Sequence, residues 1–227
     1  MDYTDSDLTF YLVVYKDLDR AKWCVKNLRL FYPKARVVIE SDGDDDPGWE
    51  DLRTDHGCEV YFGERLFEVS RGADIVSRMI NRHLDDHTLR RWLIRIDTDT
   101  EIRRRFHAMP NADYCGHRYP ERDFIQGGCI ILTRRFCRLV KDSGALDNRQ
   151  LGEDTLIWRK SPKIAKDRVE SHGLTSLDWL INWAASEIGI KGHHFEEVVS
   201  RWKKPVPRAV DCAVAHPCKD IPVDRPI

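Results

Sequence analysis

The fold of this chain of 227 residues can be inferred from one stretch, Trp92-Leu93-Ile94-Arg95-Ile96-Asp97-Thr98-Asp99. Its first five residues are apolar except for Arg95, a pattern that predicts a strand covered on both faces, as in parallel sheets. Arg95 shares one strand face with Leu93 and Asp97, so we expect its guanidinium to be partly buried and paired with a carboxylate. The strand ends at Asp97, and two acids two residues apart leave it together.

Strand and helix patterns alternate on the N-terminal side of this stretch. Strands are predicted at residues 10–14, 36–40 and 59–62, and helices at residues 19–30 and 73–84. Such alternation predicts an α/β fold with a mostly parallel, Rossmann-like sheet and helices on both faces.

The C-terminal half has a mixed character, and we expect it to belong to the same single domain, residues 1–227. Strands are predicted at residues 114–118 and 127–133, and helices at residues 135–141, 155–159 and 177–187. Residues 201–227 are rich in proline and are predicted to form an extended tail with one short apolar piece, residues 210–215.

Composition excludes several classes of protein. The 37 basic and 38 acidic residues nearly cancel, which argues against nucleic acid as the main partner. The seven cysteines include no CxxC pair, so we expect reduced core residues rather than disulfides or a zinc site. The N-terminus has no signal-peptide pattern and no apolar run approaches the ~20 residues of a membrane span, which predicts a cytoplasmic protein without a transmembrane segment.

Polar side chains follow several of the predicted strands. In an open parallel sheet ligands bind beyond the carboxyl ends of the strands, where Tyr15, Asp42, Asp97 and Asp99 are expected to meet. Carboxylate oxygens are the ligands that Mg²⁺ and Mn²⁺ prefer, and such an ion neutralises a diphosphate leaving group. Asp-x-Asp also occurs on solvated loops, but acids that end a buried strand need compensation for lost hydration. The sequence therefore predicts a metal site.

The order of these features resembles the GT-A class of nucleotide-sugar glycosyltransferases, from Phe10 to about Arg159. The Asp42-Gly43 loop, the helix that opens with Arg71-Gly72-Ala73 and carries Arg78 and Asn81, and the Asp97–Asp99 triplet resemble the nucleotide-binding half of that class. Gly127-Gly128, at the head of an apolar strand, resembles the segment that lines the donor sugar and the acceptor. Gly152-Glu153-Asp154 resembles the acidic motif of the large inverting synthase-like family.

This resemblance implies roles for individual residues. Asp99 would bind Mn²⁺ or Mg²⁺ directly, and Asp97 would contact the ion through water or bind the ribose. Tyr15, Asp42 and Arg78, with Gly127 and Gly128, would bind the donor, for which a UDP-sugar is expected. Asp154 would be the general base that deprotonates the acceptor hydroxyl, with Glu153 beside it, and the outcome would be inversion. An ordinary helix N-terminus also favours acids at these two positions.

The tail supplies two further candidates. A late histidine often completes the metal site of GT-A enzymes and a nearby lysine contacts the diphosphate, so His216 and Lys219 are candidates for these roles. A surface histidine in a proline-rich tail is the plain alternative. The pair His193-His194 is predicted to lie in a loop, and His83 and His87 on a solvated helix face.

The resemblance also divides the chain. Residues 8–110 would form the nucleotide-sugar-binding half, residues 111–200 the acceptor and catalytic half, and residues 201–227 the tail. No Gln-Arg-x-x-Arg-Trp motif follows Asp154; the nearest feature, at residues 201–204, is short. Transfer of a single sugar is therefore expected rather than polymer synthesis.

Two other functions compete with this prediction. Asp97-Thr98-Asp99-Thr100 resembles the nucleophile loop of haloacid-dehalogenase-like phosphatases, although that loop follows the first strand in those enzymes. A non-catalytic nucleotide-sugar-binding module would keep the same fold. The acceptor stays open between a glycan, a lipid-linked and a phosphate-rich molecule, because the arginine clusters at residues 90–91, 103–105 and 134–138 either bind phosphate or merely balance the acids.

Overall fold

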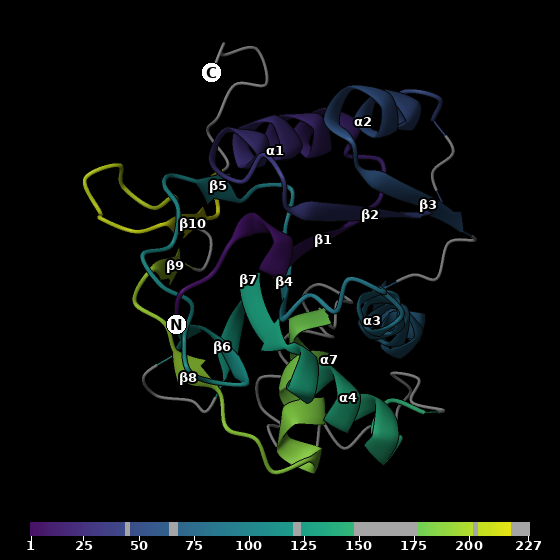
Figure 1. The fold of residues 1–227 in the computed structure, drawn as a ribbon, viewed down its shortest axis with the longest axis vertical. Helices are drawn as coiled ribbons and strands as arrows, with labels where there is room; N and C mark the ends of the chain where they lie inside the picture. Colours follow the sequence, from purple (N-terminus) through teal and green to yellow (C-terminus); the bar gives the residue numbers. More distant parts are fainter. Residues whose placement is uncertain (44–45, 64–67, 120–123, 148–176, 202–203, 219–227) are drawn as a thin grey trace.

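A computed structural model describes residues 1–43, 46–63, 68–119, 124–147, 177–201 and 204–218. Its centre is a seven-stranded sheet with the order β3-β2-β1-β4-β7-β6-β8 (Figure 1). The strands are β1 (Leu8–Val14), β2 (Arg36–Asp42), β3 (Glu59–Gly63), β4 (Trp92–Ile96), β6 (Tyr114–Arg118), β7 (Ile125–Thr133) and β8 (His193–His194). The first four are parallel, whereas β7 runs antiparallel to both of its neighbours, β4 and β6.

Helices cover both faces of this sheet, as the alternating sequence pattern predicts (Figure 1). One face carries α1 (Leu18–Phe31) and α2 (Trp49–His56), whose buried side chains Leu28 and Trp49 join the first apolar core. The other face carries α3 (Glu68–Leu84), α4 (Arg134–Ser143) and α7 (Leu177–Glu187), which form the second core. The α/β fold class with a mostly parallel sheet and mixed strands in the second half is thereby confirmed.

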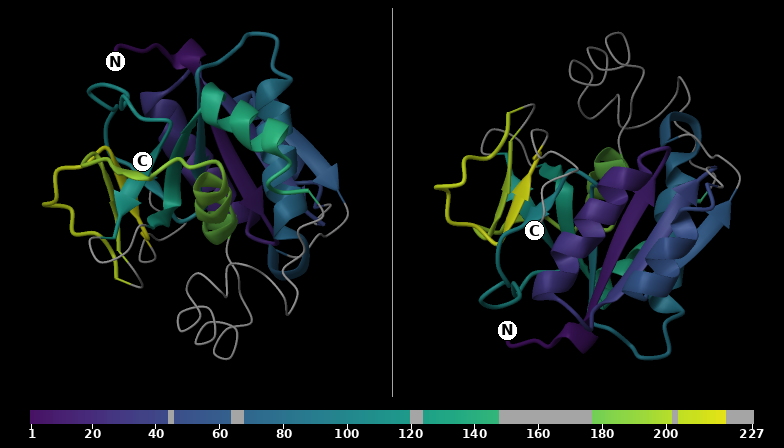
Figure 2. Two further views of the ribbon diagram at one scale, coloured as in Figure 1. Left: turned by 90° about the horizontal axis from the view of Figure 1, so that it is seen from below. Right: turned by 90° about the horizontal axis from the view of Figure 1, so that it is seen from above.

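A second, three-stranded sheet lies to one side of the main sheet (Figure 2). Its order is β5-β10-β9, formed by Glu101–Ile102, Val214–His216 and Val198–Ser200. The short apolar piece of the predicted tail therefore includes a buried strand, with Val214 and Ala215 at 0% exposure. Strands of two or three residues carry no periodic pattern, which is why only their tertiary partners reveal them.

Most predicted elements that the structure describes agree with it to within two residues, although α3 begins five residues earlier than predicted and the predicted helix at residues 155–159 lies outside the described residues. β4 and α7 span the predicted residues, and β1, β2 and α1 extend by one or two residues at an end. The predicted helix ranges do not include α2, since Trp49 and Leu52 are its only buried residues and too few to set a helical period. Its end is marked by Gly57, which adopts a left-handed conformation.

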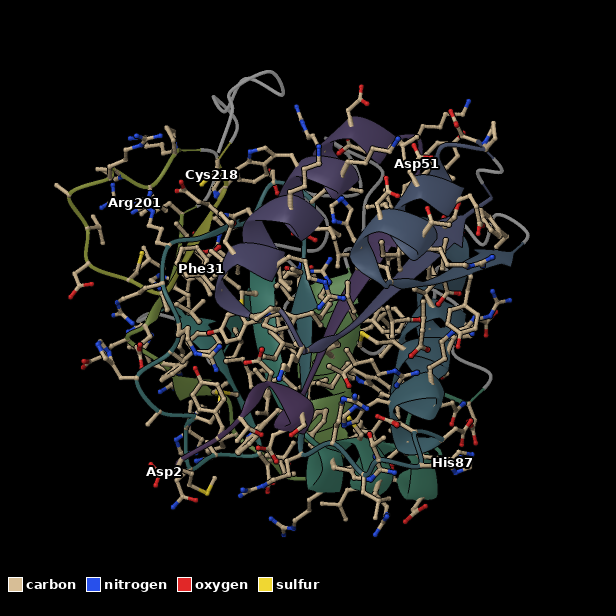
Figure 3. All side chains as sticks on the ribbon, turned by 45° about the horizontal axis from the view of Figure 1, so that its top comes forward. Asp2, Phe31, Asp51, His87, Arg201 and Cys218 are labelled. Carbon is tan, nitrogen blue, oxygen red and sulfur yellow. The ribbon has the colours of Figure 1, made fainter. Side chains whose placement is uncertain are left out.

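The structure shows which of the cysteines and histidines are buried, and so tests the sequence predictions for both residue types. All seven cysteines are free in the structure, and the six other than Cys218 are buried, as expected of core residues. The prediction of a solvated face holds for His87, which projects from the surface (Figure 3), but is wrong for His83, which is fully buried. His193 and His194 form the short edge strand β8 rather than a loop. Among the described residues, no helix combines the length and apolar character that crossing a membrane requires.

The burial of His83 predicts a dependence of stability on pH. Burial, together with the positive charge of Arg134, lowers the pKa of this imidazole from 6.5 to about 3. Between these values the unfolded chain binds a proton that the folded chain does not, so the free energy of unfolding should fall as the pH drops below 6.5. Urea titrations at pH 7 and pH 5 should show this loss, and His83→Gln should reduce it.

His87→Gln serves as the matched control, because His87 lies four residues further on and is exposed. The control should keep the same loss of stability between pH 7 and pH 5 as the unaltered protein. Equal pH dependence of the His83→Gln variant and the unaltered protein would show that His83 is not the group responsible.

Candidate functional site

Three side chains converge beyond the end of β4. The His216 Nε2 atom lies 3.0 Å from an Asp99 carboxylate oxygen and 3.3 Å from an Asp97 oxygen. One ligand atom from each of the three residues lies within 4.8 Å of the other two. Among the described residues this is the only such group of three acidic, histidine or cysteine side chains. The structure thus brings together the three residues that the sequence analysis names as candidates for the metal site.

Two distant segments deliver these side chains. Asp97 and Asp99 leave β4, while His216 ends β10, and the backbone N–H of Cys218 (labelled in Figure 3) donates to the Asp99 carbonyl at 2.8 Å. The antiparallel strand β7 begins beyond the end of β4, and the Asp97 N–H donates to the Gly128 carbonyl at 3.2 Å. The site therefore lies where β4, β7 and β10 meet.

Threonine hydroxyls hold the acidic triplet in place. Thr98 donates its hydroxyl to Asp17 at 2.8 Å, which ties the triplet to the loop between β1 and α1. Thr100 is fully buried and donates to the Gly128 carbonyl, also at 2.8 Å. Thr98 and Thr100 directly follow Asp97 and Asp99. Because their hydroxyls are bonded to Asp17 and to Gly128, the two acids occupy fixed positions on the rim of the sheet.

Arg95 forms the buried ion pair that the strand pattern predicts. Only 6% of this residue is exposed, and its guanidinium lies 2.6 Å from one oxygen of Asp97. Burial acts to raise the pKa of Asp97, but the charge of Arg95 and the hydrogen bond from His216 outweigh it and hold that pKa well below its usual range. Asp97 is therefore a carboxylate at neutral pH, with its second oxygen turned to His216.

His216 is charged in the metal-free protein. Burial acts to lower its pKa, but the hydrogen bonds to Asp97 and Asp99 and their negative charges raise it to about 9. A proton on Nε2 thus bridges two carboxylates that would otherwise repel each other. A divalent cation bound between the same three atoms would take over that role.

The glycine pair at the start of β7 makes room for the imidazole. Gly128 has a φ of +100°, and a Cβ placed on it would lie 2.1 Å from the His216 ring. A Cβ on Gly127 would lie 2.6 Å from a carboxylate oxygen of Asp178. The side chains of His216 and Asp178 therefore approach the backbone of Gly127 and Gly128 more closely than a Cβ would allow.

The donor set fits a hard divalent cation. Two carboxylates and one neutral imidazole are suitable ligands for Mn²⁺ or Mg²⁺. Neighbouring ligands of an octahedral ion with bonds of about 2.1 Å lie about 3.0 Å apart, and the His216–Asp99 and His216–Asp97 separations are 3.0 and 3.3 Å. Asp99 is the more available carboxylate, since one oxygen of Asp97 is held by Arg95.

Asp178 is a site residue that the sequence prediction omits. It lies in the first turn of α7, is 8% exposed, and accepts the backbone N–H of Gly127 at 3.1 Å. Asn182, one turn later, bonds both the N–H and the carbonyl of Ile125 and so fixes α7 against β7. Asp178 and Asn182 are one turn apart among mostly apolar residues, but their spacing alone does not indicate that they contact β7.

The other predicted donor residues lie along the rim of β1, β2 and β3. Tyr15 follows β1 and is half-buried, and Asp42 is the last residue of β2. Arg78 projects from α3, where it forms an ion pair at 3.2 Å with the buried Glu40 of β2 and lies against Gly63, the register partner of Asp42. Glu153, Asp154 and Lys219 lie outside the described residues.

Most arginines of the basic clusters serve the fold. Six of them form an ion pair with a carboxylate or a hydrogen bond to a backbone carbonyl, namely Arg90, Arg103, Arg104, Arg105, Arg134 and Arg135. Arg103, for example, pairs with Glu101 at 2.8 Å and bonds the carbonyls of Val206 and Pro207. It thereby ties the chain just after the acidic triplet to the segment that leads to His216. These contacts agree with the interpretation of the clusters as charge balance.

Solved structures resemble this fold, although the sequence matches no protein-family model and no curated protein. The apo-form glycosyltransferase GlyE from Streptococcus pneumoniae TIGR4 matches with a TM-score of 0.52 and 7% identity, over 82% of this chain and 44% of its own. The mannosyltransferase PcManGT from Pyrobaculum calidifontis, in complex with GDP-Man and Mn2+, matches with a TM-score of 0.44 and 13% identity, over 61% of this chain and 46% of its own.

The chain therefore spans less than half the length of either solved structure. At such low identity the likeness to GlyE concerns the fold, and it agrees with the predicted GT-A-like α/β fold of glycosyltransferases. The resemblance to the inverting synthase-like family stays a prediction.

Gly128→Ala should damage the site more than a comparable change elsewhere. Gly57 provides the reference, because its φ of +58° lies in the left-handed region that L residues can adopt and a Cβ there meets nothing within 4 Å. Gly57→Ala should cost about 1 kcal/mol in the free energy of unfolding. Gly128→Ala should cost about 1–3 kcal/mol more, because its φ of +100° is less accessible to alanine and its Cβ displaces the His216 ring. Urea unfolding measures both, and equal costs would contradict the close approach of His216.

Proposed function

We propose that this protein is a metal-dependent glycosyltransferase that moves a single sugar from a nucleotide-diphosphate sugar to an acceptor hydroxyl. The observation that carries the proposal is the convergence of Asp97, Asp99 and His216 on the rim of the sheet, within 4.8 Å of one another. The GT-A-like fold supports it, since ligands of open α/β sheets bind on this rim. On this proposal residues 8–110 serve the donor and residues 111–200 the acceptor.

Asp99 and His216 would hold Mn²⁺ or Mg²⁺ directly, with Asp97 as a third ligand shared with Arg95. When bound, the ion supplies the positive charge that stabilises a leaving diphosphate. The chain's own residues orient the donor around it. Tyr15, Asp42 and Arg78 would bind the nucleoside, which we expect to be a uridine, Gly127 and Gly128 would let the sugar approach the backbone, and Lys219 would contact the phosphates.

An inverting reaction needs a general base that accepts the proton of the acceptor hydroxyl, and a carboxylate is suited to that role. Asp154, with Glu153 beside it, is the first candidate on sequence grounds. Asp178 is a second one, because its buried carboxylate lies against Gly127 on the strand that also meets His216. The acceptor itself would be a glycan, a lipid-linked sugar or a phosphate-rich molecule.

The metal proposal predicts that Mn²⁺ binds to the three-residue cluster and raises the thermal midpoint. Asp99→Asn should weaken Mn²⁺ binding by more than the roughly 10–100-fold that loss of an outer partner costs, because it removes a direct ligand. Isothermal calorimetry measures the affinity. Asp55→Asn, at an exposed position of α2, is the matched control and should bind Mn²⁺ normally. Unchanged affinity in Asp99→Asn would place the ion elsewhere.

The catalytic proposal predicts Mn²⁺-dependent hydrolysis or transfer with one member of a panel of UDP-, GDP- and TDP-sugars. Replacing the true base should lower turnover by about 10²–10⁴-fold. Asp154→Asn and Asp178→Asn, tested side by side, identify which carboxylate that is. Binding of the donor without turnover would instead indicate a non-catalytic module, and hydrolysis of an aryl phosphate a phosphatase.

A further inference from the structure

We propose that Ser200 is a positioning residue that fixes the orientation and the tautomer of His216, so that Nε2 faces Asp97 and Asp99. The proposal rests on the proposed function to the extent that His216 binds a metal. It assigns a role to a side chain that neither the sequence pattern nor the metal cluster indicates.

Ser200 reaches His216 through the pairing of two short strands. It ends β9 and is the register partner of His216 in β10. Its hydroxyl oxygen lies 2.9 Å from His216 Nδ1 and 2.9 Å from the Gly127 carbonyl oxygen. Only 1% of Ser200 is exposed, so water does not compete for these contacts.

The single hydrogen of the Ser200 hydroxyl determines the direction of its hydrogen bonds to Gly127 and His216. A serine hydroxyl has one hydrogen, and the Gly127 carbonyl can only accept, so that hydrogen points to Gly127. Towards His216 the Ser200 oxygen is therefore an acceptor, and Nδ1 must carry a proton. With Nδ1 engaged by Ser200, Nε2 is the nitrogen that faces Asp97 and Asp99, where it donates its proton in the metal-free protein and would be the ligand atom of a bound cation.

The same contacts fix the plane of the ring. His216 lies against Gly128, where a Cβ would come within 2.1 Å of it, and its two nitrogens contact Ser200 on one side and Asp97 and Asp99 on the other. Turning the ring by half a rotation would replace both nitrogens by carbons and lose all of these bonds. Such outer partners of a histidine ligand commonly determine metal affinity.

Ser200, His216 and Asp97 also contain the residue types of a nucleophilic triad, but the geometry does not suit that chemistry. A serine nucleophile gives its proton to a histidine acting as base. Here the Ser200 proton points to the Gly127 carbonyl, and its oxygen is buried beneath the β7 backbone rather than open to a substrate. The hydroxyl is placed to orient His216.

Ser200→Thr and Ser200→Val test this role as a matched pair. The two side chains have nearly the same shape, but only threonine keeps the hydroxyl, so any strain from the added methyl group is common to both. Electron paramagnetic resonance of the free Mn²⁺ ion measures the affinity. Ser200→Thr should bind Mn²⁺ roughly 10- to 100-fold more tightly than Ser200→Val.

The same pair in a His216→Ala background separates positioning from a general structural effect. If Ser200 acts through His216, the affinity difference between threonine and valine should disappear once His216 is absent. Equal affinities of the two variants in the native background, or a difference that persists without His216, would overturn the inference. Absence of Mn²⁺ binding by the unaltered protein would instead overturn the proposed function, and this inference with it.

Discussion

The placement of Asp97 and Asp99 on one buried strand end imposes the constraint on which the rest of the site depends. Two carboxylates in a partly desolvated position repel each other unless positive charge lies between or beside them. Arg95 neutralises Asp97 from within β4, at 2.6 Å, and His216 bridges Asp97 and Asp99 from β10. His216 is 117 residues away from Asp99 in the sequence. The strand pairing of the second sheet places its imidazole beside Asp99, against the backbone of Gly128.

This arrangement connects the fold to the proposed chemistry. The antiparallel strand β7 extends past the end of β4 and presents Gly127 and Gly128 to three groups, His216, Asp178 and Ser200. A proton on His216 satisfies the cluster in the metal-free protein, and a divalent cation would satisfy it better, because it carries two charges and accepts all three ligands at once. The three side chains are therefore already gathered in the metal-free structure.

Local patterns made part of this structure predictable. The apolar run of β4, the placement of Arg95 opposite a carboxylate, and the exit of Asp97 and Asp99 at the sheet edge follow from periodicity and from the cost of burying charge. Ser200 and Asp178 could not be found in the same way. Their roles arise from pairing between β9 and β10 and from the contact of α7 with β7, which join segments far apart in the chain. Glu153, Asp154 and Lys219 lie outside the described residues.

On the proposed function, a metal held by Asp97, Asp99 and His216 binds the diphosphate of a nucleotide sugar. Calorimetric titration of UDP, with GDP in parallel, into the protein with and without Mn²⁺ tests it most directly. The account predicts that one nucleoside diphosphate binds in the presence of Mn²⁺, and that removal of the ion or the change His216→Ala abolishes that binding. Binding that is independent of both the ion and His216, or no binding of either nucleotide, would contradict it.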